Sequence, residues 1–140
     1  MNIAFFLTPK REIIYESMNT TMRQTLERME YHRYTAVPIL DGEGKYVGTL
    51  TQGDLLWKLK NNPEITFKNL NKIRVQDITM SVVNNPVRID SNMEDLFSIA
   101  VSQNFIPVVD DNNIFIGIIK RSVIMNYCYE MLFKKTAKEA

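Results

Sequence analysis

The amino-acid sequence contains one pattern twice, and this duplication constrains the fold more than any other feature. The segment AVPILDGEGKYVGTLTQGDLL, beginning at Ala36, aligns with FIPVVDDNNIFIGIIKRSVIM, beginning at Phe105. A proline, an aspartate and a glycine recur at one offset of 69 residues, as Pro38 and Pro107, Asp41 and Asp110, and Gly48 and Gly117. Upstream, IIYESMNTTMRQTL matches NNPVRIDSNMEDLF at an offset of 71. Self-similarity of this kind predicts two copies of one structural unit.

Both copies show the same order of periodic segments, which predicts a strand, a helix, two strands and a second helix. The first helix should begin at a cap, formed by Asn19 in the first copy and by a Ser91-x-x-Glu94 capping box in the second. The two later strands should form a hairpin. The expected strands cover residues 13–15, 37–40 and 46–50, then 87–89, 106–109 and 114–119, and the expected helices cover 22–31, 54–60, 93–102 and 122–134.

The predicted fold class is α+β, with two β-α-β-β-α repeats packed with pseudo-twofold symmetry. A three-stranded sheet with two helices is close to the lower limit for independent stability, so we expect the repeats to pack sheet to sheet. Paired clefts where the repeats meet would be natural small-molecule sites. The predicted boundaries are 1–60 for the first repeat, 61–77 for a linker with a helical turn near 67–70, and 78–140 for the second repeat.

Charge and cysteine content exclude several classes of function. Lys and Arg number 17 against 16 Asp and Glu, so no overall field attracts nucleic acid or a membrane surface. The apolar run 3–7 is far shorter than the ~20 residues of a membrane-spanning helix. The single cysteine, Cys128, excludes an intramolecular disulfide and agrees with a reducing compartment. We therefore expect a soluble, cytoplasmic protein.

Three residues interrupt the pattern YVGTLTQGDLLWKL: Gly48, Thr51 and Asp54. A glycine inside a strand is typical of a bulge, tight packing or close approach of a ligand. Thr51 and Asp54 have a structural interpretation as a helix cap with a supporting acid. They also have a functional one, because a carboxylate accepts strong hydrogen bonds from vicinal hydroxyls and a helix N-terminus favours anions.

The motifs xxxPVxD and GxxTxxD, in order and nearly twice, resemble the signature of the CBS domain, named after cystathionine β-synthase. The stretch from Ile13 to about Lys134 is similar to a tandem CBS pair, or Bateman module. The resemblance implies a regulatory module that binds an adenosine-containing ligand such as AMP, ADP, ATP, S-adenosylmethionine or cyclic di-AMP between the repeats. We expect no required cofactor, no metal site among the residues and no enzymatic activity, while the sequence leaves open whether a metal accompanies the phosphate. With no catalytic or transport domain attached, the signal is expected to pass to a separate target protein.

The resemblance also implies two sets of ligand-binding residues. In a first cleft, Thr51 and Asp54 would hold phosphate and ribose opposite Asn85, Asn104, Phe105 and Ile106. In a second cleft, Lys120 and Arg121 would face Ile14, Tyr34, Thr35 and Ala36. The second copy departs from the motif, since Lys120 replaces the threonine and Val123 replaces the aspartate. The two cations at this position suit a phosphate, as in small bacterial CBS pairs that bind cyclic di-AMP. The alternative interpretation is that Lys120 and Arg121 only form the solvated start of a helix.

The remaining residues offer little for catalysis. His32 is the only histidine, and the sequence has no P-loop, no GxGxxG and no zinc-ligand spacing. The closing helices are apolar almost all round, which predicts either packing on their own sheets or a homodimer formed through them. The alternative function is a ligand-free scaffold that acts through these helices. Binding to single-stranded nucleic acid would need a basic groove interleaved with aromatics, which the charge balance disfavours.

Overall fold

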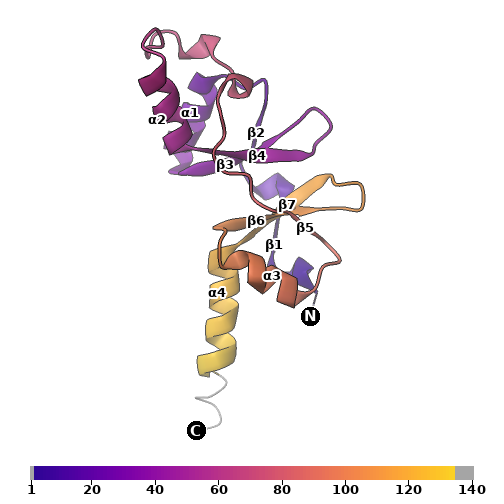
Figure 1. Cartoon of the computed structure of the whole chain (residues 1–140). Helices are drawn as coiled ribbons and strands as arrows, with labels where there is room; N and C mark the ends of the chain where they lie inside the picture. Colours follow the sequence, from indigo (N-terminus) through magenta and orange to yellow (C-terminus); the bar gives the residue numbers. More distant parts are fainter. Residues whose placement is uncertain (1, 135–140) are drawn as a thin grey trace. The chain divides into compact units, whose positions relative to one another are not determined.

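The computed structural model describes residues 2–134, which form two compact units (Figure 1). The first-repeat unit spans Ile14–Val83. The second-repeat unit combines the residues up to Ile13 with those from Asn84 onward. Each unit has its own hydrophobic core and its own sheet.

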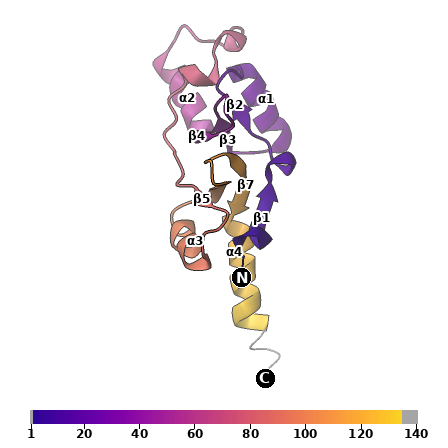
Figure 2. The same cartoon turned by 90° about the vertical axis from the view of Figure 1, so that its right-hand side faces the viewer.

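The first-repeat unit places two helices on one face of a three-stranded sheet (Figures 1 and 2). The sheet has the order β2-β3-β4, in which β2 pairs parallel and β4 antiparallel with β3. Met22, Ile39, Leu50 and Leu55 belong to the core between sheet and helices. The elements are β2 (Glu16–Ser17), α1 (Met22–His32), β3 (Ala36–Leu40), β4 (Tyr46–Thr51), α2 (Gln52–Asn61) and the 3-10 turns Leu70–Lys72 and Val75–Asp77.

The second-repeat unit repeats this arrangement and adds one strand from the N-terminal segment. Its sheet has the order β1-β7-β6-β5, and β1 pairs antiparallel with β7. Its elements are the 3-10 turns Ile3–Phe6 and Lys10–Glu12, β1 (Leu7–Pro9), β5 (Val87–Arg88), α3 (Met93–Ala100), β6 (Phe105–Val109), β7 (Phe115–Lys120) and α4 (Arg121–Tyr129), which continues as the π-helical turn Glu130–Lys134. The predicted α+β fold with two β-α-β-β-α repeats is therefore confirmed.

The two hairpins are built alike, which explains the repeated Asp and Gly landmarks. Asp41 accepts hydrogen bonds from the backbone N–H groups of Glu43 and Lys45, at 2.8 and 3.0 Å. Asp110 accepts the same pair from Asn112 and Ile114, also at 2.8 and 3.0 Å. The Lys45 N–H in particular lowers the pKa of the Asp41 carboxyl, because these donors favour its charged form. Each acid thus organises its own turn.

Two predicted caps are wrong by one or two residues. Thr21, rather than Asn19, caps α1, through a reciprocal pair of hydrogen bonds with Gln24. Asn92 caps α3 by accepting a hydrogen bond from the Asp95 N–H at 2.9 Å, so the predicted Ser91-x-x-Glu94 box is displaced by one residue. Both segments carry several adjacent residues that could cap, and local sequence does not select among them.

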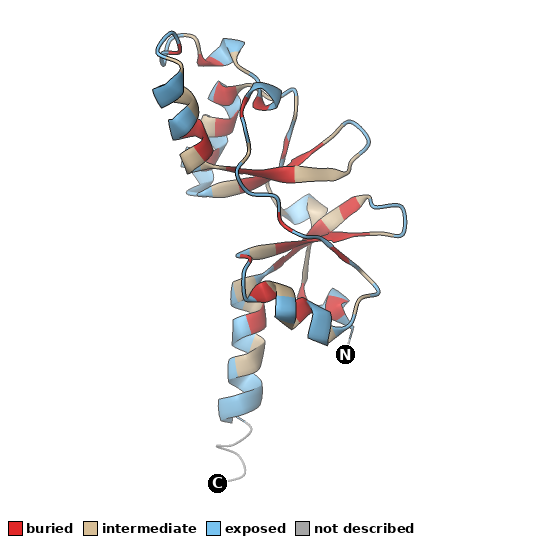
Figure 3. Cartoon of the chain, in the orientation of Figure 1, coloured by how far each residue is buried: buried red, intermediate tan, exposed pale blue. Residues whose placement is uncertain are grey.

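The N-terminal segment departs most from the sequence-based expectation. The strand expected at 13–15 is instead β2, Glu16–Ser17, and β1 was not predicted at all. Ile3 and Phe6 are buried in the core of the second-repeat unit (Figure 3). The sequence repeat places the N-terminal segment with the first repeat, but its contacts place it in the second-repeat unit. The reason is that β1 extends the sheet of the second repeat. Among the described residues, no helix has the length and apolar character that crossing a membrane requires.

The equivalent glycines Gly48 and Gly117 are needed for different reasons. A side-chain carbon at Gly117 would overlap the carbonyl oxygen of Thr8 on β1 and lie 2.8 Å from Cδ1 of Leu7. At Gly48 it would meet only the Met80 side chain, with Sδ at 3.0 Å. Gly117 therefore admits a neighbouring backbone, whereas Gly48 admits a flexible side chain.

Candidate functional site

The predicted ligand residues of the first-repeat unit gather where β3 begins and β4 ends. Ala36 pairs with Thr51 across the hairpin, and the Gln52 N–H donates to the Thr35 carbonyl at 3.0 Å. The exposed Tyr34 ring stacks on His32, with centroids 5.5 Å apart. Tyr34, Thr35, Ala36 and Thr51 therefore lie together at the N-terminus of α2. Ile14 is half-buried and packs against the core of the same unit.

The second-repeat unit places its predicted residues at the equivalent position. Phe105 pairs with Lys120, and the Arg121 N–H donates to the Asn104 carbonyl at 2.9 Å, as Gln52 does to Thr35. Lys120 is exposed at the start of α4. The Ile106 side chain is fully buried in the core, so only its backbone is available to a ligand. Both units thus present loop backbone and a helix N-terminus at one end of the sheet.

Asp54 occupies the third position of α2 and is 3 % exposed. It forms a capping box with Thr51: the Asp54 N–H donates to Thr51 Oγ1 at 3.1 Å, and Asp54 Oδ2 accepts from the Thr51 N–H at 3.0 Å. The structural interpretation of these two residues is therefore correct as far as it goes. The cap uses only Oδ2 of the Asp54 carboxylate, so the hydrogen-bond partner of Oδ1 must lie elsewhere.

The partner of Asp54 Oδ1 is Ser81, a residue that the sequence analysis did not identify. Asp54 Oδ1 accepts hydrogen bonds from the Ser81 hydroxyl at 2.7 Å and from the Ser81 N–H at 3.2 Å. The residues around this contact line a hollow of about 470 Å³: Asp54, Trp57, Lys58, Asn61, Asn62, Thr79 and Ser81. Its volume falls within the usual range of ligand pockets. The buried carboxylate therefore borders an open space, with its oxygens held in fixed directions.

A second network organises the site residues of the second-repeat unit. Gln103, which the sequence analysis did not identify, is 7 % exposed. Its amide accepts from the Asn85 N–H at 2.8 Å and donates to the Asn85 carbonyl at 3.2 Å. Arg121 Nε donates to the carbonyls of Ala100 and Gln103, at 2.9 and 3.0 Å. Asn85, Asn104, Phe105 and Arg121 are thereby tied into one cluster, and the Arg121 guanidinium is fixed in direction.

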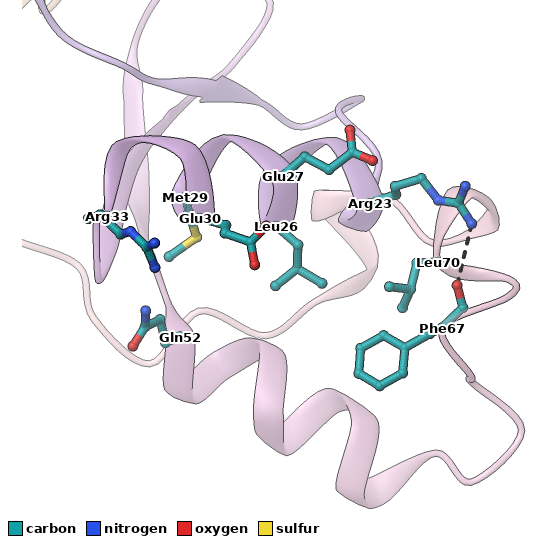
Figure 4. A pocket seen from close by; sticks show the side chains of 9 residues that line it. All are labelled: Arg23, Leu26, Glu27, Met29, Glu30, Arg33, Gln52, Phe67 and Leu70. Carbon is teal, nitrogen blue, oxygen red and sulfur yellow. Dashed lines mark hydrogen bonds between the residues drawn. The ribbon is translucent and has the colours of Figure 1, made fainter.

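A larger hollow, of about 700 Å³, lies between α1, the start of α2 and the segment leading to Leu70 (Figure 4). Leu26, Met29, Phe67 and Leu70 supply its apolar lining. Arg23, Glu27, Glu30, Arg33 and Gln52 supply its polar side chains, and Arg23 donates to the Phe67 carbonyl at 3.4 Å. Within residues 2–134, no group of three or more His, Cys, Asp or Glu side chains is placed to hold a metal ion.

Known proteins resemble this chain in both sequence and fold. A curated relative, the chloroplastic CBS domain-containing protein CBSX1 of Arabidopsis thaliana, is 26 % identical over an alignment of 144 positions, gaps included, that covers 86 % of this chain. The chain spans 61 % of the length of that relative. Solved structures with the same fold include CbpB of Listeria monocytogenes in complex with c-di-AMP, at 21 % identity and a TM-score of 0.79, covering 93 % of this chain and 96 % of that one.

Two further structures extend this likeness. Another structure of CbpB with c-di-AMP has a TM-score of 0.83 at 20 % identity, covering 99 % of this chain and 91 % of that one. CBSX2 in complex with AMP has a TM-score of 0.71 at 23 % identity, and the match covers 93 % of this chain and 97 % of that one. The family profile described as CBS domain matches residues 6–61 and again residues 75–130. With two matched repeats over most of its length, the chain belongs to the CBS domain family as a tandem pair.

Proposed function

We propose that this protein is a regulatory module of the cytoplasm that binds an adenine nucleotide and signals its presence to a separate protein. The observation that carries the proposal is the Asp54 carboxylate, which is almost fully buried, oriented by three hydrogen bonds and placed beside a hollow. A carboxylate held in this way can accept hydrogen bonds from the two vicinal hydroxyls of a ribose. CbpB with c-di-AMP and CBSX2 with AMP, which share this fold, support an adenine ligand.

The remaining groups of the first-repeat site suit the other parts of a nucleotide. The N-terminus of α2, at Gln52, favours the charge of a phosphate. Tyr34, Thr35 and Ala36, which the family resemblance assigns to the second cleft opposite Lys120 and Arg121, offer backbone groups to a base edge there. No step of bond making or breaking is assigned, since a regulatory ligand need only bind one state of the protein more tightly than another.

A thermal-shift panel tests the proposal, because a ligand that binds the native state alone raises the unfolding midpoint. The panel comprises AMP, ADP, ATP, cyclic di-AMP, S-adenosylmethionine and NAD. We expect at least one of the first four to raise the midpoint in proportion to the logarithm of its concentration, and 2′-deoxy-AMP to do so less than AMP. Midpoints unchanged by every compound at millimolar concentration would refute a nucleotide-binding function.

Two cations of the second-repeat unit favour a ligand with more than one phosphate. Lys120 and Arg121 bring two cations to the start of α4, where the first repeat has Thr51 and Gln52. A ligand with two phosphates would gain from both cations. If cyclic di-AMP is the ligand, Lys120→Ala should weaken it more than it weakens AMP.

The scaffold function remains the alternative, and exposed apolar side chains on the closing helices support it. Leu56 and Trp57 are exposed on α2, and Met125, Tyr129, Leu132 and Phe133 are exposed on α4 and its π-helical turn (Figure 3). The exposed apolar side chains of α4 and its π-helical turn also support a homodimer, since exposed apolar patches mark protein contacts.

The dimer prediction is tested by sedimentation at about 100 µM protein. We expect a mass near twice the 16.3 kDa of the chain, and a shift toward the monomer when Leu132 and Phe133 are both replaced by serine. Val101→Ser is the matched control, because Val101 is an exposed apolar residue at the end of α3. A wild-type protein that sediments as a monomer would contradict the dimer.

A further inference from the structure

We propose that residues 79–83 form a strap whose Ser81 competes with the ligand for Asp54, so that nucleotide binding releases the strap. The inference rests on the proposed function, and it assigns that function a moving element. The strap directly precedes Asn84, where the chain returns to the second-repeat unit. The strap therefore forms part of the chain that connects the two units.

Three contacts hold the strap to the first-repeat unit. Ser81 donates to Asp54 Oδ1 through its hydroxyl and its N–H. The Val82 carbonyl accepts a hydrogen bond from the Thr49 N–H of β4 at 2.9 Å, in an isolated bridge. Met80 lies over Gly48, in the space that a larger residue would fill. Met80 also packs against the hydrophobic core of this unit. The strap is thus attached by one core-packed side chain and by isolated hydrogen bonds rather than by a continuous ladder.

The contact with Asp54 is the one that a nucleotide would disturb. A carboxylate offers about four acceptor positions, and Asp54 already uses three of them, for the Thr51 N–H and the two Ser81 donors. Two ribose hydroxyls therefore find only one position free. The Thr51 bond is part of the α2 cap and lies within a rigid helix turn, whereas the Ser81 donors come from exposed chain. Ser81 is the donor that gives way.

Because most of the strap is exposed, releasing it should require little free energy. Thr79, Ser81, Val82 and Val83 are all exposed, and only Met80 is half-buried. Segments with few buried contacts open locally at low free energy, well before the rest of a domain. Because linkage is reciprocal, a protein that bound the released strap would in turn tighten nucleotide binding. The strap is therefore suited to convert occupancy at Asp54 into a change that a partner can detect.

Calorimetric titration of three variants with AMP and cyclic di-AMP tests the strap. Ser81→Ala removes the competing hydroxyl from the free protein, so it should bind at least about tenfold more tightly than wild type. Ser81→Thr keeps a hydroxyl and should bind like wild type. Thr66→Ala removes an exposed hydroxyl of the same unit that lies outside the hollow and touches none of the three bonds to Asp54, and it should also bind like wild type.

Amide hydrogen exchange supplies a second measurement. Saturating nucleotide should speed exchange at the Ser81 and Thr49 N–H groups, which the strap contacts protect. Unchanged or weaker binding by Ser81→Ala, in a protein that binds nucleotide through Asp54, would overturn the strap and leave the proposed function standing. Slower exchange at both amides with nucleotide would likewise overturn it. Failure of wild type and Ser81→Ala alike to bind any nucleotide would overturn both proposals.

Discussion

Replacing Asp54 by alanine should abolish measurable nucleotide binding by the first-repeat site. The buried carboxylate is the only anionic acceptor in the hollow formed by the described residues, and a ribose would direct two hydroxyls to it. Hydrogen bonds to a charged group contribute about 1.5–3 kcal/mol each, so losing two should weaken binding by at least about 100-fold. Titration calorimetry of wild type and Asp54→Ala with AMP measures the difference.

Asp77→Ala is the matched control for this variant. Asp77 also accepts a hydrogen bond from a capping backbone N–H, that of Arg74 at 3.0 Å, within the same unit. Its loss should therefore reproduce the cost of removing a capping acid without removing a ribose acceptor. If Asp54→Ala binds AMP as tightly as Asp77→Ala does, Asp54 takes no part in binding, and Lys120 and Arg121 become the leading candidates.

Gly117→Ala should destabilise the second-repeat unit more than any other single methyl group added to a strand of the described chain. The new Cβ would overlap the carbonyl oxygen of Thr8 and lie 3.1 Å from Cα of Pro9, both on the strand that pairs with β7. Backbone atoms of a paired strand cannot yield without breaking the pairing. We expect a loss of about 3 kcal/mol in unfolding free energy and a fall of roughly 10 °C in the midpoint.

Gly48→Ala is the control for the glycine prediction, because it adds the same group at the equivalent position of the first repeat. There the Cβ would meet the Met80 Sδ at 3.0 Å and Cε at 3.1 Å, and the end of a methionine side chain can move aside. We expect a cost of about 1 kcal/mol or less. Urea unfolding measures both variants. Equal losses of unfolding free energy would show that the β1 backbone does not closely approach Gly117 of β7.

The long elements could be predicted from the sequence because each hairpin carries its own signals. An apolar run, a Pro, an Asp turn and a Gly occur together, and both hairpins match their predicted bounds within one residue at each end. The two-residue strands β2 and β5 are too short to show a period. The predicted strand at 87–89 matches β5, whereas the one predicted at 13–15 misses β2. Strand β1 could not be predicted, since its three residues become a strand only by pairing with β7, 110 or so positions away.

The candidate site shows the same division between local and distant information. Thr51 and Asp54 could be identified because a capping box and a family motif share the same spacing. Ser81 could not, because it contacts Asp54 from 27 residues away, and nothing in the local sequence marks that hydroxyl. Gln103 was missed for a similar reason, since its amide becomes informative only once it is seen to hold Asn85 from 18 residues away. Motifs therefore identify the candidate ligand-binding residues, and the structure identifies the side chains that contact and position them.

A crystal structure of the protein with AMP tests the central claim most directly. The account predicts a ribose with at least one hydroxyl within about 3 Å of an Asp54 carboxylate oxygen, as hydrogen bonding to a charged acceptor requires. It also predicts that the Ser81 hydroxyl then lies well beyond its present 2.7 Å from Asp54 Oδ1. A nucleotide bound elsewhere, with Asp54 still holding both Thr51 and Ser81, would contradict the account.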